Sequence, residues 1–180
     1  TVVTQLQRSP GAFFDQKFHP NGAKLYNARI IPIRGSWIDF TTDINDILFT
    51  IIDRKRKFPA TLLLRSLGFS TDEDIYNAFG LIHELDPSKI KDEEIANYIV
   101  VEDIIDTETG ELFVEGGKEL NESILKTLVK SGSKSVKLVD VRNSIDSMMI
   151  HNTIQKDPTK STEEALTKVY FLLRGSEAPS

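Results

Sequence analysis

The pattern of apolar and polar positions along the first 53 residues is typical of β-strands, and residues 47–53 alternate as a strand should. Four segments rich in β-branched and aromatic residues carry this pattern, at 1–6, 25–33, 37–42 and 47–53. Polar turn signals separate them, such as Pro10-Gly11 and the tip "HPNG" that ends at Gly22. Because such turns join neighbouring strands, the stretch predicts an antiparallel β-meander.

Helical spacing replaces this alternation after Phe58. Pro59 suits the first turn of a helix and Gly68 the position after its end, which predicts a helix over 59–67. Ser70 and Glu73 have the spacing of a capping box, so a second helix is expected over 70–82.

The tail predicts one further helix. Ser161 and Glu164 again have the spacing of a capping box. The apolar residues that follow at helical spacing are Leu166, Val169, Tyr170 and Leu173.

The middle of the chain has a different character. Residues 84–97 are polar and are expected to form a boundary, and residues 98–143 contain short strand patterns, turns and a helix that Asn121 could cap. We therefore expect an α+β fold, in which residues 1–83 form a β-meander with packed helices. A small β-rich module would occupy 98–143, and residues 144–180 would return to the first domain with the C-terminal helix.

Charge divides the chain in the same way. Residues 1–70 contain 10 Lys and Arg against 5 Asp and Glu, whereas residues 71–180 contain 12 against 22. This split indicates a basic first surface and an acidic second one, although scattered solvated charges would give the same count. The chain has no cysteine, which excludes disulfide scaffolds and thiol catalysis and fits a reducing cytosol. It begins at Thr1 and reads like the middle of a protein, so we expect a fragment.

Catalytic patterns are missing from the sequence. His19, His83 and His151 stand in unrelated contexts, and "DTETGE" at 106–111 does not match a calcium loop. Neither a phosphate-binding glycine loop nor a nucleophile elbow occurs. We predict no catalytic residue and no metal site in this chain.

Two features point towards nucleic acid. The first is the cation run Arg54 to Lys57, which is expected at a strand end, where Arg54 and Arg56 would reach one partner together. The second is Trp37, the only tryptophan, which follows Arg34 in a polar turn and could stack on an unpaired base. Cations that guard a sheet edge and a half-buried core tryptophan explain the same residues equally well.

The helices at 59–67 and 70–82 leave another alternative open, a helix-turn-helix. The acidic residues Asp72, Glu73 and Asp74 at the start of the second helix speak against it, because phosphates would repel them.

Longer stretches resemble a known family. "VVTQLQRSPGAFFD", "LYNARIIPIRGSWIDF" and "IDRKRKFPATLLLRSLGFS" closely resemble segments of the β subunit of bacterial DNA-dependent RNA polymerase, in the family's order and at close to its spacing. The tail "DPTKSTEEALTKVYFLLRGSEAPS" resembles the later return into the same domain, the β lobe. The middle of the chain resembles β-rich modules of both large subunits, whose presence varies between lineages.

The resemblance implies a lobe that grips downstream duplex DNA and the non-template strand. Val3 and Gln5 match the edge of the rifamycin pocket, and Asp53 matches a member of a cluster that faces the DNA channel. The expected DNA-binding residues are Arg8, Arg34, Trp37, Arg54, Lys55, Arg56 and Lys57.

The same resemblance implies a nucleotidyltransferase whose catalytic Mg²⁺ is bound by the β′ subunit, so no cofactor is expected here. The expected partners are DNA and the α, β′ and σ subunits, in the cytoplasm at the nucleoid and without a membrane. Two rivals remain: a free-standing DNA-binding regulator that uses 59–82, and a module that docks a protein through its acidic part.

Overall fold

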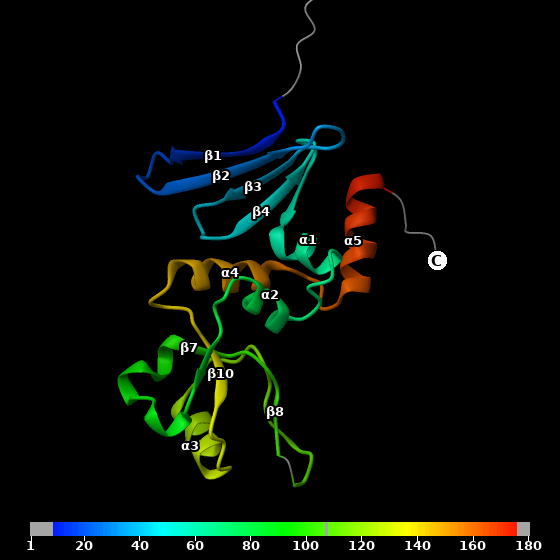
Figure 1. The fold of residues 1–180 in the computed structure, drawn as a ribbon. Helices are drawn as coiled ribbons and strands as arrows, with labels where there is room; N and C mark the ends of the chain where they lie inside the picture. Colours follow the sequence, from blue (N-terminus) through cyan, green and yellow to red (C-terminus); the bar gives the residue numbers. More distant parts are fainter. Residues whose placement is uncertain (1–8, 107, 176–180) are drawn as a thin grey trace, which may run out of the picture.

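A five-stranded antiparallel sheet forms the first part of the protein in this computed structural model, which describes residues 9–106 and 108–175 (Figure 1). Its strands follow chain order and are β1 (Gly11–Phe18), β2 (Lys24–Ile31), β3 (Ile38–Thr42), β4 (Leu48–Ile52) and β5 (Arg56–Pro59). The meander and the α+β class are therefore confirmed. The strand expected over 1–6 lies outside the described residues.

The two faces of this sheet have different environments. The paired residues Phe14, Ala28, Phe40, Thr50 and Phe58 form one row across all five strands. Along this row the exposed fraction falls from 82% at Phe14 to 0% at Thr50 and 3% at Phe58. Helices therefore cover this inner face at β4 and β5 and leave it open at β1, while the other face looks outward (Figure 1).

Three helices pack on or beside the inner face: α1 (Ala60–Ser66), α4 (Ile145–Lys156) and α5 (Thr162–Arg174). The sequence predicts α1 and α5 but not α4. Thr153 joins α4 to the sheet, because its hydroxyl accepts a hydrogen bond of 2.9 Å from the amide of Leu48.

The expected apolar stripe of α5 is partly wrong. Ala165 is fully buried, and Val169 and Leu172 pack beside it against Phe58 and Leu62. The larger residues of the expected stripe, Leu166, Tyr170 and Leu173, are 37–52% exposed.

The second helix, α2 (Asp72–Ala78), begins two residues later than expected. Thr71, not Ser70, is the N-cap, and its side chain and that of Asp74 form the reciprocal bonds of a capping box. Ser70 has another partner, since its hydroxyl accepts a hydrogen bond of 3.1 Å from the amide of Thr162 at the start of α5.

A buried ion pair connects these helices. The side chains of Arg65 and Asp157 are fully buried, and the guanidinium Nε lies 3.2 Å from the Asp157 carboxylate. Arg65 also donates to Asp72 and to the carbonyl of Ser70. Asp157 further accepts hydrogen bonds from the Thr61 hydroxyl at 2.9 Å and from the amide and hydroxyl of Thr159 at 2.8 and 2.6 Å. Polar groups of α1, of the start of α2 and of the end of α4 thus satisfy one another around the buried Arg65 and Asp157.

A smaller module lies on the far side of α2 and α4 (Figure 1). Its main sheet has the order β6-β10-β7, and β8 and β9 form a separate pair. The elements are β6 (His83–Leu85), η1 (Pro87–Lys89), η2 (Asp92–Asn97), β7 (Tyr98–Val100), β8 (Ile104–Ile105), β9 (Leu112–Val114), α3 (Glu122–Lys130) and β10 (Val136–Asp140). Asn121 caps α3 as expected, accepting from the amide of Ile124.

Residues 84–97, expected as a boundary, pack with the module. They include most of β6 and both 3-10 helices, and Leu85, Ile90 and Ile95 contact the hydrophobic cluster that also contains Leu128 and Leu138.

The module and the first domain share one further cluster. Val101 and Val139 of the module pack with Ile75 of α2 and Ile154 of α4. At its edge the ammonium of Lys137 lies 2.6 Å from the carboxylate of Glu73 and 3.3 Å from that of Glu102, and hydrogen bonds to both raise its pKa. Apolar packing and ion pairs therefore fix the module on the helices.

Candidate nucleic-acid interface

The cation run occupies a turn and the strand after it, and not a strand end as expected. β4 ends at Ile52, and the amide of Lys55 donates to the carbonyl of Ile52 at 3.1 Å, which closes a turn around Asp53 and Arg54. β5 then begins at Arg56. The sequence did not predict this turn, because no glycine marks it.

Asp53 and Arg54 have φ values of 50° and 58°. Positive φ at both central residues is the conformation of a type I′ turn, which usually contains Asn and Gly. A residue other than glycine held in this region costs about 1–3 kcal/mol. The turn thus keeps two charged residues in a conformation that glycine would adopt more easily.

The strained turn holds the main chain of Trp37. The Asp53 amide donates to the Trp37 carbonyl at 3.0 Å, and the Trp37 amide donates to the Asp53 carboxylate, also at 3.0 Å. These bonds fix the start of β3 against the β4–β5 turn.

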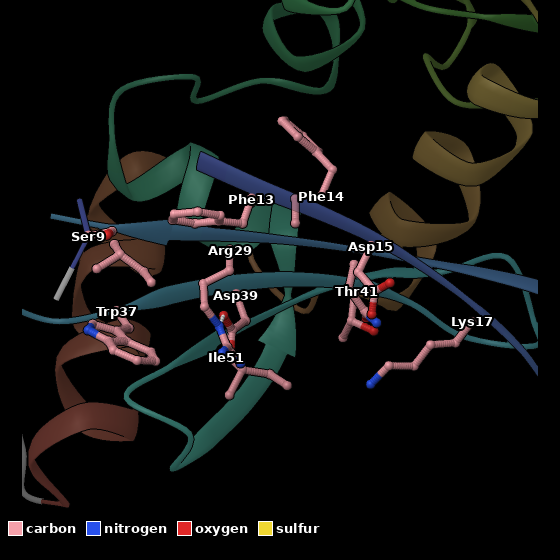
Figure 2. A pocket seen from close by; sticks show the side chains of 13 residues that line it. Ser9, Phe13, Phe14, Asp15, Lys17, Arg29, Trp37, Asp39, Thr41 and Ile51 are labelled. Carbon is pink, nitrogen blue, oxygen red and sulfur yellow. Dashed lines mark hydrogen bonds and ion pairs between the residues drawn. The ribbon is translucent and has the colours of Figure 1, made fainter. Parts of the chain in front are cut away.

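Two guanidinium groups lie close to the indole of Trp37. The Arg29 carbon Cζ is 5.1 Å from the ring centroid, and that of Arg54 is 5.3 Å from it. Both distances are within the range of cation–π contacts. The ring is half-buried and borders an open hollow of about 580 Å³ on the outer face of the sheet (Figure 2).

Arg29 belongs to an ion pair that crosses the sheet. Arg29 and Asp39 face each other in the β2–β3 register, and their side chains form two hydrogen bonds of 2.6 and 3.1 Å. This bidentate contact raises the pKa of the Arg29 guanidinium, which is charged at any ordinary pH. Figure 2 shows the pair beside Trp37, above Ile51 of β4.

The remaining cations divide between the two faces. Lys57 pairs with Ile51, and its ammonium lies 4.3 Å from the centroid of the Phe49 ring, so it belongs to the outer face with Trp37 and Arg54. Arg56 points to the other face, because successive side chains of a strand alternate. The expectation that Arg54 and Arg56 share a face is therefore wrong, and Arg54 and Lys57 share one instead.

The other residues expected at the site have no such arrangement. Arg34 and Lys55 are exposed. Val3, Gln5 and Arg8 lie outside the described residues. Sequence reasoning missed Arg29 and Asp39, which could be found only by pairing their strands in register.

The start of α2, which would enter a DNA groove in a helix-turn-helix, is occupied. Asp72 contacts Arg65, and Glu73 contacts Lys137 of the module. The helix has 7 residues. This geometry does not present α2 to a groove.

Within residues 9–106 and 108–175, no group of three or more histidine, cysteine, aspartate and glutamate side chains could hold a metal ion. In the same part of the chain, no helix has the length and apolar character that crossing a bilayer requires.

Comparisons with known proteins agree on one family. A sequence model described as "RNA polymerase Rpb2, domain 2" matches residues 8–122. The DNA-directed RNA polymerase subunit beta of Cytophaga hutchinsonii is 42% identical over 196 residues, and that of Flavobacterium johnsoniae is 44% identical over 201 residues. The subunit of Chlorobaculum tepidum is 44% identical over 183 residues. Each match covers 99% of this chain but only 14–15% of the relative. The chain therefore belongs to the family of DNA-directed RNA polymerase β subunits, and it spans about 15% of the length of these relatives.

Proposed function

We propose that this chain is a DNA-holding lobe of a multisubunit RNA polymerase. It would grip downstream duplex DNA and the separated non-template strand during DNA-templated RNA synthesis. One observation carries the proposal: a strained turn holds the main chain of Trp37, and the same turn brings the guanidinium of Arg54 to 5.3 Å from the centroid of the half-buried indole.

The physical basis is the combination of a ring and unneutralised charge. An aromatic side chain contributes about 1–3 kcal/mol for each base that stacks on it, whatever the base. Arg54 and Lys57 lie on the same face and would neutralise phosphates of the strand, which releases counterions. A surface that combines both suits an unpaired strand better than a closed duplex.

The other components of the reaction would come from the rest of the enzyme. We place the Mg²⁺ that supports nucleotidyl transfer in another subunit, and we propose no catalytic residue here. The expected partners stay DNA and the α, β′ and σ subunits, at the nucleoid in the cytoplasm.

The test compares cations on the two faces in the assembled polymerase. We expect the double variant Arg54→Ala and Lys57→Ala to shorten the lifetime of a complex with forked DNA, measured after a competitor is added. The logarithm of the binding constant falls as the logarithm of the salt concentration rises, and the magnitude of this negative slope should decrease by roughly 1.4 to 1.8, because two phosphate contacts are lost.

Arg56→Ala is the matched control. Arg56 is also exposed and lies between the other two in sequence order, but it points to the opposite face. We expect it to leave the salt dependence nearly unchanged. Equal effects of the double variant and the control, or no effect of either at low salt, would contradict the proposal.

A further inference from the structure

Among residues 9–106 and 108–175, Arg29 and Arg54 lie at nearly the same distance from the Trp37 ring, but they differ in whether a carboxylate neutralises their charge. Arg29 is 5.1 Å from the ring centroid, and the carboxylate of Asp39 neutralises its charge through two hydrogen bonds. Arg54 is 5.3 Å from the centroid and exposed, and it forms no ion pair with a carboxylate in the part of the chain that the structure describes. The pair around Arg29 is therefore close to neutral, whereas Arg54 keeps its full charge.

The two side chains also differ in how firmly they are held. Arg29 and Asp39 extend from central strands of the sheet, at directly paired positions. A bidentate contact between the planar guanidinium and a carboxylate fixes the plane of the guanidinium. Arg54 extends from a three-residue connection between strands, and its guanidinium contacts the Trp37 ring without a carboxylate partner among the described residues.

We propose that Arg29 and Asp39 are positioning residues, which fix the plane of the Trp37 ring for a stacked base. Arg54, by contrast, supplies the charge that attracts the strand. This division of roles rests on the proposed function, and it assigns to Arg29 a contribution that does not depend on phosphate contacts.

The two roles give different signals. Stacking is measured by an abasic penalty, the ratio of complex lifetimes with an intact base and with an abasic site at one position of the non-template strand. For an aromatic contact worth about 1–3 kcal/mol the ratio is roughly 5- to 150-fold. Attraction is measured by the slope of affinity against salt concentration.

The experiment uses the assembled polymerase and a set of forked DNA molecules, in which an abasic site is moved along the non-template strand. Trp37→Ala identifies the position that depends on the indole, because the abasic penalty disappears there. Arg29→Met and Asp39→Asn are then compared with wild type at this position. Arg142→Met, an exposed arginine of the module, is the matched control.

The two variants change the local charge in opposite directions. Arg29→Met leaves a carboxylate without its partner, and Asp39→Asn leaves a guanidinium without its partner. We expect both to reduce the abasic penalty to less than about threefold, since both loosen the ring. We expect Asp39→Asn to steepen the salt dependence and Arg29→Met to flatten it. A general loss of folding would instead shorten the lifetime with every DNA by the same factor.

Two results would overturn the inference. If Trp37→Ala removes the penalty but both variants keep it, Arg29 and Asp39 do not position the ring. If Arg29→Met only flattens the salt dependence and the penalty is unchanged, Arg29 acts as a phosphate contact. A wild-type polymerase without an abasic penalty at any position would refute the proposed role of Trp37 itself, so the two failures are distinguishable.

Discussion

Replacing Asp157 tests whether the buried ion pair holds the helices together. Its carboxylate accepts hydrogen bonds from Arg65, from the Thr61 hydroxyl and from two groups of Thr159. Asp157→Asn keeps the shape of the side chain but removes its charge. It also replaces one accepting oxygen with an NH₂ group, which would face the hydrogen-bond donors of these partners. Arg65, which is 0% exposed, then keeps Asp72 as its ionic partner among the described residues.

The expected loss follows from this burial. Removing one partner of a buried ion pair costs about 3–5 kcal/mol, because the other charge stays away from water. We expect the lower end of this range, about 3 kcal/mol, since Asp72 still contacts Arg65. For a chain of this size that loss lowers the melting temperature by roughly 6–12 °C.

Urea unfolding of the purified chain, followed by circular dichroism, measures the difference. Asp146→Asn, at an exposed position in the first turn of α4, is the matched control and should change the free energy of unfolding by less than about 1 kcal/mol. Replacing both charges with apolar residues, as Arg65→Met with Asp157→Leu, should cost less than Asp157→Asn alone. A loss below about 1 kcal/mol for Asp157→Asn would refute this account of the ion pair.

Two further predictions concern pH and backbone strain. Burial lowers the pKa of His151, whose Nδ1 lies 3.0 Å from the Tyr76 hydroxyl, although Glu119 and Asp72 partly oppose the shift. His151 therefore binds a proton more readily in the unfolded chain, and the free energy of unfolding should fall as the pH drops below about 6.5. Urea titrations at pH 7.5 and 5.5 measure this dependence, and His151→Gln should flatten it. Arg54→Gly should stabilise the chain by up to about 1 kcal/mol, because glycine adopts the positive φ of this position without strain. The variant should still shorten the lifetime of the DNA complex. A lower melting temperature of the variant would show that the turn is not strained.

Much of the fold could be predicted because local signals agree with the final structure. Segments rich in β-branched and aromatic residues indicated β2, β3 and β4, which lie within a residue or two of their expected positions. Asn121 caps α3 because its side chain is suited to accept from the helix start.

The missed helix α4 has a physical explanation. Its buried face contains Ser147 and Thr153 beside Ile150 and Ile154, so polarity does not alternate at helical spacing. The tertiary contact between Thr153 and Leu48 satisfies a polar group that the sequence places in the core. In α5 the small residue Ala165 allows close packing against α1, which a search for large apolar residues overlooks.

The candidate site could be predicted only in part. Trp37 and the cation run are visible as residue types, but their common face depends on where the β4–β5 turn begins. A shift of one residue in a strand moves each side chain to the other face, and no local signal separates Arg56 from Lys57. The Arg29–Asp39 pair depends on the register of β2 against β3, which the sequence does not state.

The positions at which the chain enters and leaves the module affect where the protein can tolerate an insertion. The entering strand β6 and the leaving strand β10 are neighbours, with His83 paired to Leu138, so both passages occur at one place. Val101 and Val139 must be retained, because they complete a cluster with α2 and α4. The β8–β9 pair contributes no residue to this cluster, and its residues Ile105 and Leu112 are more than half exposed. A reporter group grafted between β8 and β9 would therefore leave the outer face of the sheet, with Trp37 and Arg54, undisturbed.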